Sequence, residues 1–336
     1  MRAAAVIVAL AGCASFEDPT IVLDLRVLAI QAEPPEIILD VDPARPPDVA
    51  ALFAQLEQQP ILLRALLTEP GHTRDLEWEM SACMLAEGGR CDDGRPRVAV
   101  ASGLAADPES TGFVPGCGER GIEEGGVVCA MLVPDAAFAT LLYDALRADP
   151  TGGLGGLDVG IALQVGARGA DGATAGEVHA SKLVRIAPRI PAERIANTNP
   201  HIEELLFGGG IGVGTAVPRS HCASSRGASP DVRSGQVVTL YPTARDGDRE
   251  EYVVPTLDGA TRRFTEYLSY QWIAIAGSFS DPETGGPPDP FGNVRLDGTE
   301  WTAPAVAEPT DISIWVIQRD GRFGVTWRET CLQVIP

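Results

Sequence analysis

Short runs of alternating apolar and polar residues dominate the chain. At residues 76–80 three apolar side chains alternate with two glutamates, and residues 267–279 form a mostly apolar run around Trp272. A period of two is typical of strands with one buried face. Further strands are predicted at residues 21–31, 61–67, 127–133, 157–165, 177–186, 237–241, 251–254, 312–318 and 322–331. We therefore expect an all-β protein with Trp78 and Trp272 in its cores.

Two segments have helical spacing instead. Residues 135–148 place four apolar side chains on one stripe, between a capping aspartate at Asp135 and a proline at Pro150. A shorter helix is predicted from Asp48 to Gln58. We expect the longer helix to pack over one end of the sheets.

Glycine and proline mark the turns. The chain has 37 Gly and 27 Pro but few aromatic residues, which favours many turns between short strands. Residues 83–129 read as loop-rich, and Asp320-Gly321 predicts a hairpin between the last two strands. Residues 187–200 contain three prolines and no periodic pattern, so we interpret them as a linker between domains at 21–186 and 201–336.

The N-terminus has the layout of an export signal. Arg2 precedes an apolar run at 3–10 that is too short to span a bilayer, and Leu10-Ala11-Gly12-Cys13 follows. The plainer interpretation is an ordinary signal peptide with an incidental cysteine. The four residues resemble the bacterial lipobox. That resemblance implies a signal peptide at 1–12, lipidation of Cys13, a tether at 13–20 and a cell-envelope location, with Ala14 mildly favouring the outer membrane.

Six cysteines remain besides Cys13. An even number in an exported chain predicts three disulfides. Proximity along the chain suggests the pairs Cys83 with Cys91, Cys117 with Cys129, and Cys222 with Cys331. Zinc is the alternative, but no pair has the two-residue spacing of a zinc knuckle and no histidine lies at a matching offset.

The net charge of the chain argues against one class of partner, nucleic acid. The formal net charge is −20, so the surface repels phosphate backbones and nucleic acid is excluded as an expected partner. The acidic residues are scattered along the chain, which favours a role in solubility over a single acidic binding face.

Motifs for catalysis or cofactor binding are weak. The glycine run at 208–214 has no following Gly-Lys-Ser/Thr, so we interpret it as a flexible loop. The four histidines lie far apart, and no Gly-x-Ser-x-Gly elbow occurs. Loop carboxylates could bind Ca²⁺ but lack a fixed ligand spacing, which favours a solvated loop: Asp281, Glu283, Asp289 and Asp297. We expect no metal and no cofactor.

The C-terminal segment carries a more specific pattern. Tyr270-x-Trp272, Gly277-x-Phe279, Trp301-Thr302-Ala303-Pro304 and the final hairpin resemble the Ig-like or PKD-like β-sandwich modules of uncharacterised bacterial lipoproteins. The likeness covers residues 200–336, and the first domain shares only Trp78 and the rhythm of its strands. It implies two Ig-like antiparallel β-sandwich domains, the first with a helical insertion. A Cys222–Cys331 pair departs from the usual Cys, Trp, Cys spacing.

Three functions stay open. The first is a lipid-anchored envelope protein that acts as a non-catalytic binding or structural module, with an envelope protein or polysaccharide as partner. The second is a secreted carbohydrate-active or hydrolytic enzyme whose site lies in the interdomain cleft, where carboxylates would converge between aromatic walls. The third is polysaccharide binding through an exposed Trp301 or Trp327.

Overall fold

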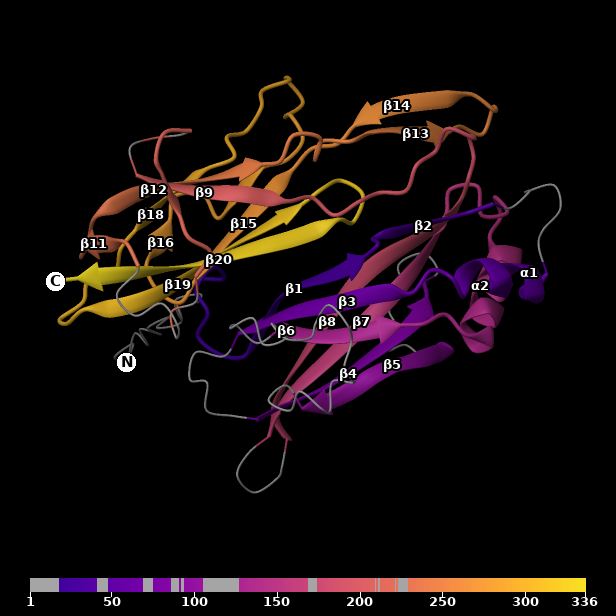
Figure 1. Ribbon diagram of the computed structural model, residues 1–336, viewed down its shortest axis with the longest axis horizontal. Helices are drawn as coiled ribbons and strands as arrows, with labels where there is room; N and C mark the ends of the chain where they lie inside the picture. The colour runs from indigo at the N-terminus through magenta and orange to yellow at the C-terminus, as the bar shows by residue number, and fades with distance from the viewer. Residues whose placement is uncertain are drawn as a thin grey trace, which may run out of the picture.

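The computed structural model describes residues 18–40, 48–68, 75–85, 91, 94–104, 127–168, 174–208, 210, 212–220, 222 and 229–336. Within these residues the chain forms strands and two short helices, so the protein is all-β (Figure 1). None of the helices in these residues is long and apolar enough to cross a membrane.

The first part of the chain forms what we call the N-terminal sandwich. One sheet has the order β1-β3-β6 and the other the order β2-β8-β7-β4-β5. Their inner faces enclose one apolar core that includes Trp78, which is 1% exposed. The strands are β1 (Arg26–Glu33), β2 (Glu36–Leu39), β3 (Ile61–Thr68), β4 (Asp75–Met84), β5 (Arg97–Leu104), β6 (Val127–Leu132), β7 (Leu157–Arg168) and β8 (Thr174–Pro188).

Both predicted helices are confirmed, and together they cover one end of this sandwich (Figure 1). Helix α1 (Val49–Leu56) begins after Asp48, whose carboxylate accepts a hydrogen bond from the amide of Ala51. Helix α2 (Ala136–Ala148) begins in the same way after Asp135. The side chains that the helices bury join the core between the sheets, as their apolar spacing requires: Leu52, Leu56, Phe138, Ala139 and Leu142.

The remaining strands form the C-terminal sandwich. Its sheets have the orders β10-β9-β12-β18-β16 and β11-β20-β19-β15-β17, and β13 and β14 form a separate hairpin. The strands are β9 (Ile202–Gly208), β10 (Thr215–Val217), β11 (Asp231–Arg233), β12 (Val237–Ala244), β13 (Glu251–Pro255), β14 (Thr261–Thr265), β15 (Ser269–Ala274), β16 (Ser278–Phe279), β17 (Glu283–Gly285), β18 (Thr299–Thr302), β19 (Thr310–Arg319) and β20 (Val325–Ile335).

The two sandwiches share one topology. The order β1-β3-β6 corresponds to β9-β12-β18, and β2-β8-β7-β4-β5 corresponds to β11-β20-β19-β15-β17. The buried tryptophans occupy equivalent strands, Trp78 on β4 and Trp272 on β15. Division of the strands between two sheets in this way, with a core tryptophan in the third long strand, is the immunoglobulin arrangement. The expected class of two Ig-like sandwiches with a helical insertion in the first is confirmed.

Besides the strands that were not predicted, among them β5 within the segment expected to be loop-rich, two details of the strands differ from the expectation. Two of the three five-stranded sheets have one parallel edge pair, β2 with β8 and β11 with β20, while the other pairs of named strands in the described residues are antiparallel. The strand predicted at 21–31 begins only at Arg26, because Ile21 forms an isolated bridge with Ala274 of the other sandwich. Thr20, in the expected tether, is likewise buried and accepts a hydrogen bond from the amide of Ala274.

A third apolar layer joins the two sandwiches. The outer face of β1-β3-β6 packs on the outer face of β15-β19-β20, so four sheets stack in sequence (Figure 1). The buried residues of this layer come from both sandwiches: Val22, Leu28, Ala29, Leu66, Ile273, Trp315, Ile317 and Val325. Because each buried apolar side chain favours association by about 1.5 to 3 kcal/mol, this layer fixes the relative orientation of the sandwiches.

The segment at 187–200, interpreted as a linker, is held between the sandwiches. Asn199 donates its Nδ2 to the carbonyl oxygen of Ala32 at 2.7 Å, and its Oδ1 accepts from the amide of Val325 at 2.9 Å. Asn197 donates its Nδ2 to the Asp320 carboxylate at 3.1 Å. Both asparagines are at most 3% exposed. The linker thus bonds to both sandwiches and is no flexible tether, although the domain boundaries themselves stay a prediction.

Two of the three expected disulfides fall within the described residues. Cys83 is bonded to Cys91, eight residues away, and Cys222 is bonded to Cys331, 109 residues away. Cys129 is also disulfide-bonded, while its expected partner Cys117 lies outside the described residues.

Loop length should separate the two disulfides energetically. Replacing Cys222 and Cys331 together by Ser should lower the free energy of unfolding by about 4 to 5 kcal/mol, because the bond closes a long loop in the unfolded chain. Replacing Cys83 and Cys91 together should cost about 2 to 3 kcal/mol. Urea unfolding of both double variants measures these losses. A larger loss for the Cys83 and Cys91 variant would contradict the loop-closure argument.

Candidate functional site

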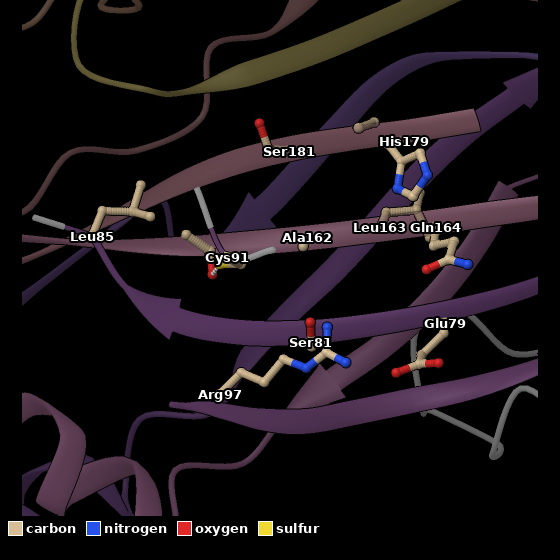
Figure 2. A pocket seen from close by; sticks show the side chains of 12 residues that line it. Glu79, Ser81, Leu85, Cys91, Arg97, Ala162, Leu163, Gln164, His179 and Ser181 are labelled. Atoms are coloured by element: carbon tan, nitrogen blue, oxygen red, sulfur yellow. Dashed lines mark hydrogen bonds between the residues drawn. The ribbon is translucent and has the colours of Figure 1, made fainter. Parts of the chain in front are cut away.

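One polar surface of the N-terminal sandwich is a hollow on the solvent-facing side of its five-stranded sheet. The hollow has a volume of about 260 Å³ and crosses β8, β7, β4 and β5. Figure 2 shows Glu79, Gln164 and His179 at one end and Leu85 with Cys91 at the other. We call it the sheet-face pocket.

Small residues on the central strand create this hollow. Ile161, Leu163 and Val165 of β7 point into the core, so the outward positions between them are Gly160, Ala162 and Gln164. The Cys83–Cys91 disulfide brings Leu85 and Cys91 over one end of the strand. A Cβ atom at position 160 would lie 3.0 Å from the sulfur of Cys91 and from Leu85, so a larger residue there would have to displace these side chains by a few tenths of an ångström.

The polar lining is mixed in charge. Glu79 and Ser81 come from β4, Arg97 from β5, and His179 and Ser181 from β8 (Figure 2). The imidazole Nε2 of His179 lies 2.9 Å from Oε1 of Glu177, and both side chains are exposed. His179 is the only ring in the described lining, so the pocket offers hydrogen bonds and both signs of charge but no aromatic platform.

A second cavity lies in the cleft between the sandwiches. It has a volume of about 430 Å³ and is lined by β1, β8, Tyr267 and the turn from β19 to β20. Its charged groups are Lys182, Arg319 and Asp320. Asp320 organises the turn, since its Oδ1 accepts hydrogen bonds from the amides of Arg322 and Gly324 at 2.7 and 2.8 Å. We call this space the interdomain cavity.

Beside the interdomain cavity lies a cluster of ionic groups around Arg322. Glu36 of β2, which is 2% exposed, is bound by Arg194 of the linker at 2.8 Å and by Arg322 of the C-terminal sandwich. Arg322 also lies 3.5 Å from Glu250 and 3.4 Å from Glu266, and its guanidinium covers the ring of Tyr252 at 4.6 Å. We call these five charged groups the Arg322 cluster.

The Arg322 cluster has more carboxylates than guanidinium groups. Three glutamates share two arginines, and Asp320 adds a further negative charge nearby. Burial, followed by the charge of Asp320, raises the pKa of Glu266 to about 8, against the opposing effect of Arg322. Glu266 therefore holds a proton over a pH range in which an exposed glutamate would be ionised.

The charged groups of the Arg322 cluster can be compared with the enzyme site expected in the interdomain cleft. Carboxylates and tyrosines do converge there, but each of the three glutamates of the cluster lies within ion-pair distance of an arginine. Glu36 neutralises two buried guanidinium groups and has little freedom to protonate a leaving group, because moving it would leave both cations unpaired. Glu266 holds a proton but lies against Arg322 in the same network, so the Arg322 cluster fits a structural joint better than a pair of catalytic carboxylates.

The tryptophans proposed for polysaccharide stacking are not free. Trp301 is 0% exposed and donates its Nε1 to the carbonyl oxygen of Ala276. Trp327 is partly buried, and the guanidinium of Arg64 lies 5.6 Å from its ring centre. The prediction of an exposed Trp301 is wrong, because the residue lies on the inner face of β18 within the core.

The remaining candidates are spread through the fold. Cys13, His72 and His221 lie outside the described residues, and His201 pairs with Asp248 at 3.4 Å. The glycine run at 208–214 connects β9 to its antiparallel neighbour β10, although Gly209 and Ile211 lie outside the described residues. In the described part of the chain, no three His, Cys, Asp or Glu side chains are grouped so that they could hold a metal ion.

Sequence reasoning missed the sheet-face pocket, and it named the interdomain cleft as a possible site without the residues that line the cavity there. The sheet-face pocket depends on which strands lie side by side, and its one local signal was the alternation of small residues at 160 and 162 with large apolar ones. For the interdomain cavity a signal was available in composition, because Lys182 is the only lysine in the chain.

Comparisons with known proteins give no family. No protein-family model matches the chain, and no curated protein matches it. Similar solved structures include dimeric latent PorU from Porphyromonas gingivalis, with 11% identity, a TM-score of 0.20 and coverage of 93% of this chain and 24% of that chain.

Two further solved structures are similar over most of this chain. The tandem V-type regions of VCBP3, a v-region-containing chitin binding protein, have 9% identity and a TM-score of 0.27, with 93% of this chain and 100% of that chain covered. Red sea bream transglutaminase has 11% identity and a TM-score of 0.21, with 94% and 32% covered. The chain thus spans about a quarter of PorU and a third of the transglutaminase. Likenesses at these TM-scores assign no function to it.

Breaking the Arg322 cluster at Glu36 should be costly. Glu36→Gln leaves Arg194 and Arg322 without their shared counter-ion, so the free energy of unfolding should fall by about 3 kcal/mol or more. Asp40→Asn is the matched control, because it breaks the exposed pair with Arg189 and should cost less than about 1 kcal/mol. Urea unfolding compares the variants, and equal losses would contradict the assigned role of Glu36.

Protonation of Glu266 should make stability depend on pH. The folded chain keeps this proton up to about pH 8, whereas the unfolded chain releases it near pH 4.5, so stability should fall as pH rises between these values. Glu266→Gln cannot ionise and should remove more than about 1 kcal/mol of that fall. Unfolding titrations at about pH 5 and about pH 8 test this, with the exposed Glu251→Gln as control. If the free energy of unfolding of Glu266→Gln fell with pH as steeply as that of wild type, the assigned role of Glu266 would be refuted.

Proposed function

We propose that this chain is a lipid-anchored cell-envelope protein that works as a non-catalytic binding module, with the sheet-face pocket as its binding surface. The observation that carries the proposal is the pocket itself, an accessible mixed polar hollow on a sheet whose other face is locked into the core. In the interdomain cleft, by contrast, Glu36 is already paired with two arginines, and Glu250 and Glu266 lie within ion-pair distance of Arg322.

The arrangement of the chain supports an anchor close to the protein body. Thr20 and Val22 are hydrogen-bonded to Ala274 at 2.9 Å each, so the attachment point is fixed on the stacked sheets. Only six residues separate Cys13 from Thr20, a span of at most about 25 Å over seven residue steps. A lipid on Cys13, as the resemblance to the lipobox implies, would hold the sandwiches near the membrane surface, in our proposal that of the outer membrane.

The mixed lining of the sheet-face pocket suits a small polar segment of an envelope protein or an envelope polysaccharide. One carboxylate, one guanidinium, one imidazole and two hydroxyl groups can give and accept hydrogen bonds on the same ligand. Without an aromatic platform, recognition would rest on these hydrogen bonds, and binding would weaken as the polar groups are removed.

The anchor is tested by expression in a bacterial host that processes lipoproteins. Wild-type protein should enter the detergent phase of a partition experiment and start at an acylated Cys13 by intact mass, because several acyl chains give stable attachment. The Cys13→Ala variant, which cannot be acylated, is the control and should stay in the aqueous phase. Wild-type protein in the aqueous phase would refute the anchor.

The binding surface is tested separately by filling the sheet-face pocket. Soluble peptide and saccharide fragments of the envelope are screened by thermal unfolding against wild type and Ala162→Leu, which adds bulk on the solvent side of β7 only. A fragment that binds the pocket should raise the melting temperature of wild type and not of the variant. Equal rises in melting temperature for wild type and Ala162→Leu would show that the fragment binds outside the sheet-face pocket.

A further inference from the structure

Lys182 stands apart in both composition and position. It is the only lysine among the 26 Lys and Arg residues of the chain. It lies on β8, is 8% exposed, and lines the interdomain cavity of about 430 Å³. An amine is the one basic side-chain group other than imidazole that can lose its proton and become a nucleophile in a protein, which a guanidinium cannot do.

The surroundings of Lys182 favour its neutral form. Its Nζ donates a hydrogen bond to the carbonyl oxygen of Phe323, an uncharged acceptor that a neutral amine can also use. Burial lowers the pKa of Lys182 to about 8; Asp320 opposes this shift and the neighbouring cation Arg319 adds to it. A desolvated lysine beside a second cation is one of the arrangements that activate amines for attack on carbonyl carbon.

Arg319 supplies a second group on the same cavity wall. Its Nη1 donates to the side-chain oxygen of Gln271 at 3.0 Å, and this acceptor carries no charge. Burial lowers the pKa of Arg319 and the carboxylate of Glu283 opposes that shift, so the guanidinium remains a cation that can attract an anion entering the interdomain cavity. The cavity thus brings an amine and an anion-binding group together in a space large enough for a small molecule.

We propose that Lys182 is a reactive amine that forms a reversible imine with a small carbonyl compound whose carboxylate is held by Arg319, as in a 2-oxo acid. The lone pair of Nζ adds to the carbonyl carbon, and the resulting carbinolamine loses its oxygen as one molecule of water. The C=N bond replaces the C=O bond, so the step needs no oxidant or reductant. The site is distinct from the sheet-face pocket and does not depend on the lipid anchor.

A reductive trap on the full chain tests the proposal. The folded protein is incubated with glyoxylate and sodium cyanoborohydride, digested and mapped by mass spectrometry. Lys182 should carry a carboxymethyl group, and the rate of adduct formation should rise as pH approaches about 8, where the neutral amine becomes abundant. The full chain with Cys13→Ala is used, because its N-terminal amine is not acylated and can serve as the internal reference beside the one lysine.

Two comparisons separate a site from ordinary amine reactivity. Acetaldehyde lacks the carboxylate and should modify Lys182 more slowly than glyoxylate does, relative to the N-terminal amine. Arg319→Gln should lower the glyoxylate rate by about tenfold or more and leave the acetaldehyde rate within a few-fold, since one charge-assisted contact is lost. Lys182→Arg keeps the positive charge and should abolish the adduct.

Two results would overturn the proposal that Lys182 is a reactive amine. If Lys182 is modified in urea but not in the folded protein, the residue is a structural strut between the sandwiches and the proposal fails. Equal rates for glyoxylate and acetaldehyde would refute the role of Arg319. Because the urea comparison leaves Lys182 unchanged, it remains decisive if Lys182→Arg does not fold.

Discussion

The structure depends on the sheet β11-β20-β19-β15-β17 being apolar on both faces. Trp272 and Ile314 fill the core of the C-terminal sandwich, while Trp315 and Ile317 on the opposite face need a second cover. The outer face of β1-β3-β6 provides that cover. A sheet buried on both faces cannot exchange one partner for water without exposing a large apolar surface, so the two sandwiches form one rigid stack.

This stacking decides where polar groups can lie at the joint. Around the apolar layer, backbone groups and charges are withdrawn from water and must find partners within the protein. The buried asparagines Asn197 and Asn199 and the buried carboxylate of Glu36 serve this purpose, and each bonds to groups on more than one segment of the fold. The charged residues at the joint are therefore best understood first as the polar rim of a packed interface.

Local patterns predicted the elements but not the joint between them. Caps and apolar stripes located both helices, and alternation located the strands that carry Trp78 and Trp272. Strand β5 was missed because as an edge strand its burial does not alternate cleanly. Residues 187–200 looked like a tether because Pro and Asn are also the composition of loops, and only the neighbouring sandwiches give Asn197 and Asn199 partners. The sheet-face pocket could not be predicted for a similar reason, because its lining residues come from four strands that become neighbours only in the folded sheet.

The buried arginines and the buried lysine between the sandwiches behave differently, because all of them are withdrawn from water and only the arginines are paired with a carboxylate. Arg194 and Arg322 keep their charge when buried and can each bind carboxylate through a planar fork, so they suit permanent pairing with Glu36. Lys182 lines a cavity, and its Nζ donates a hydrogen bond to the carbonyl oxygen of Phe323. Burial there lowers the pKa of Lys182, and the charge of Asp320 offsets this effect only in part. A rigid stack of sheets can maintain this unfavourable environment, since the apolar layer between the sandwiches, and not Lys182, holds them together.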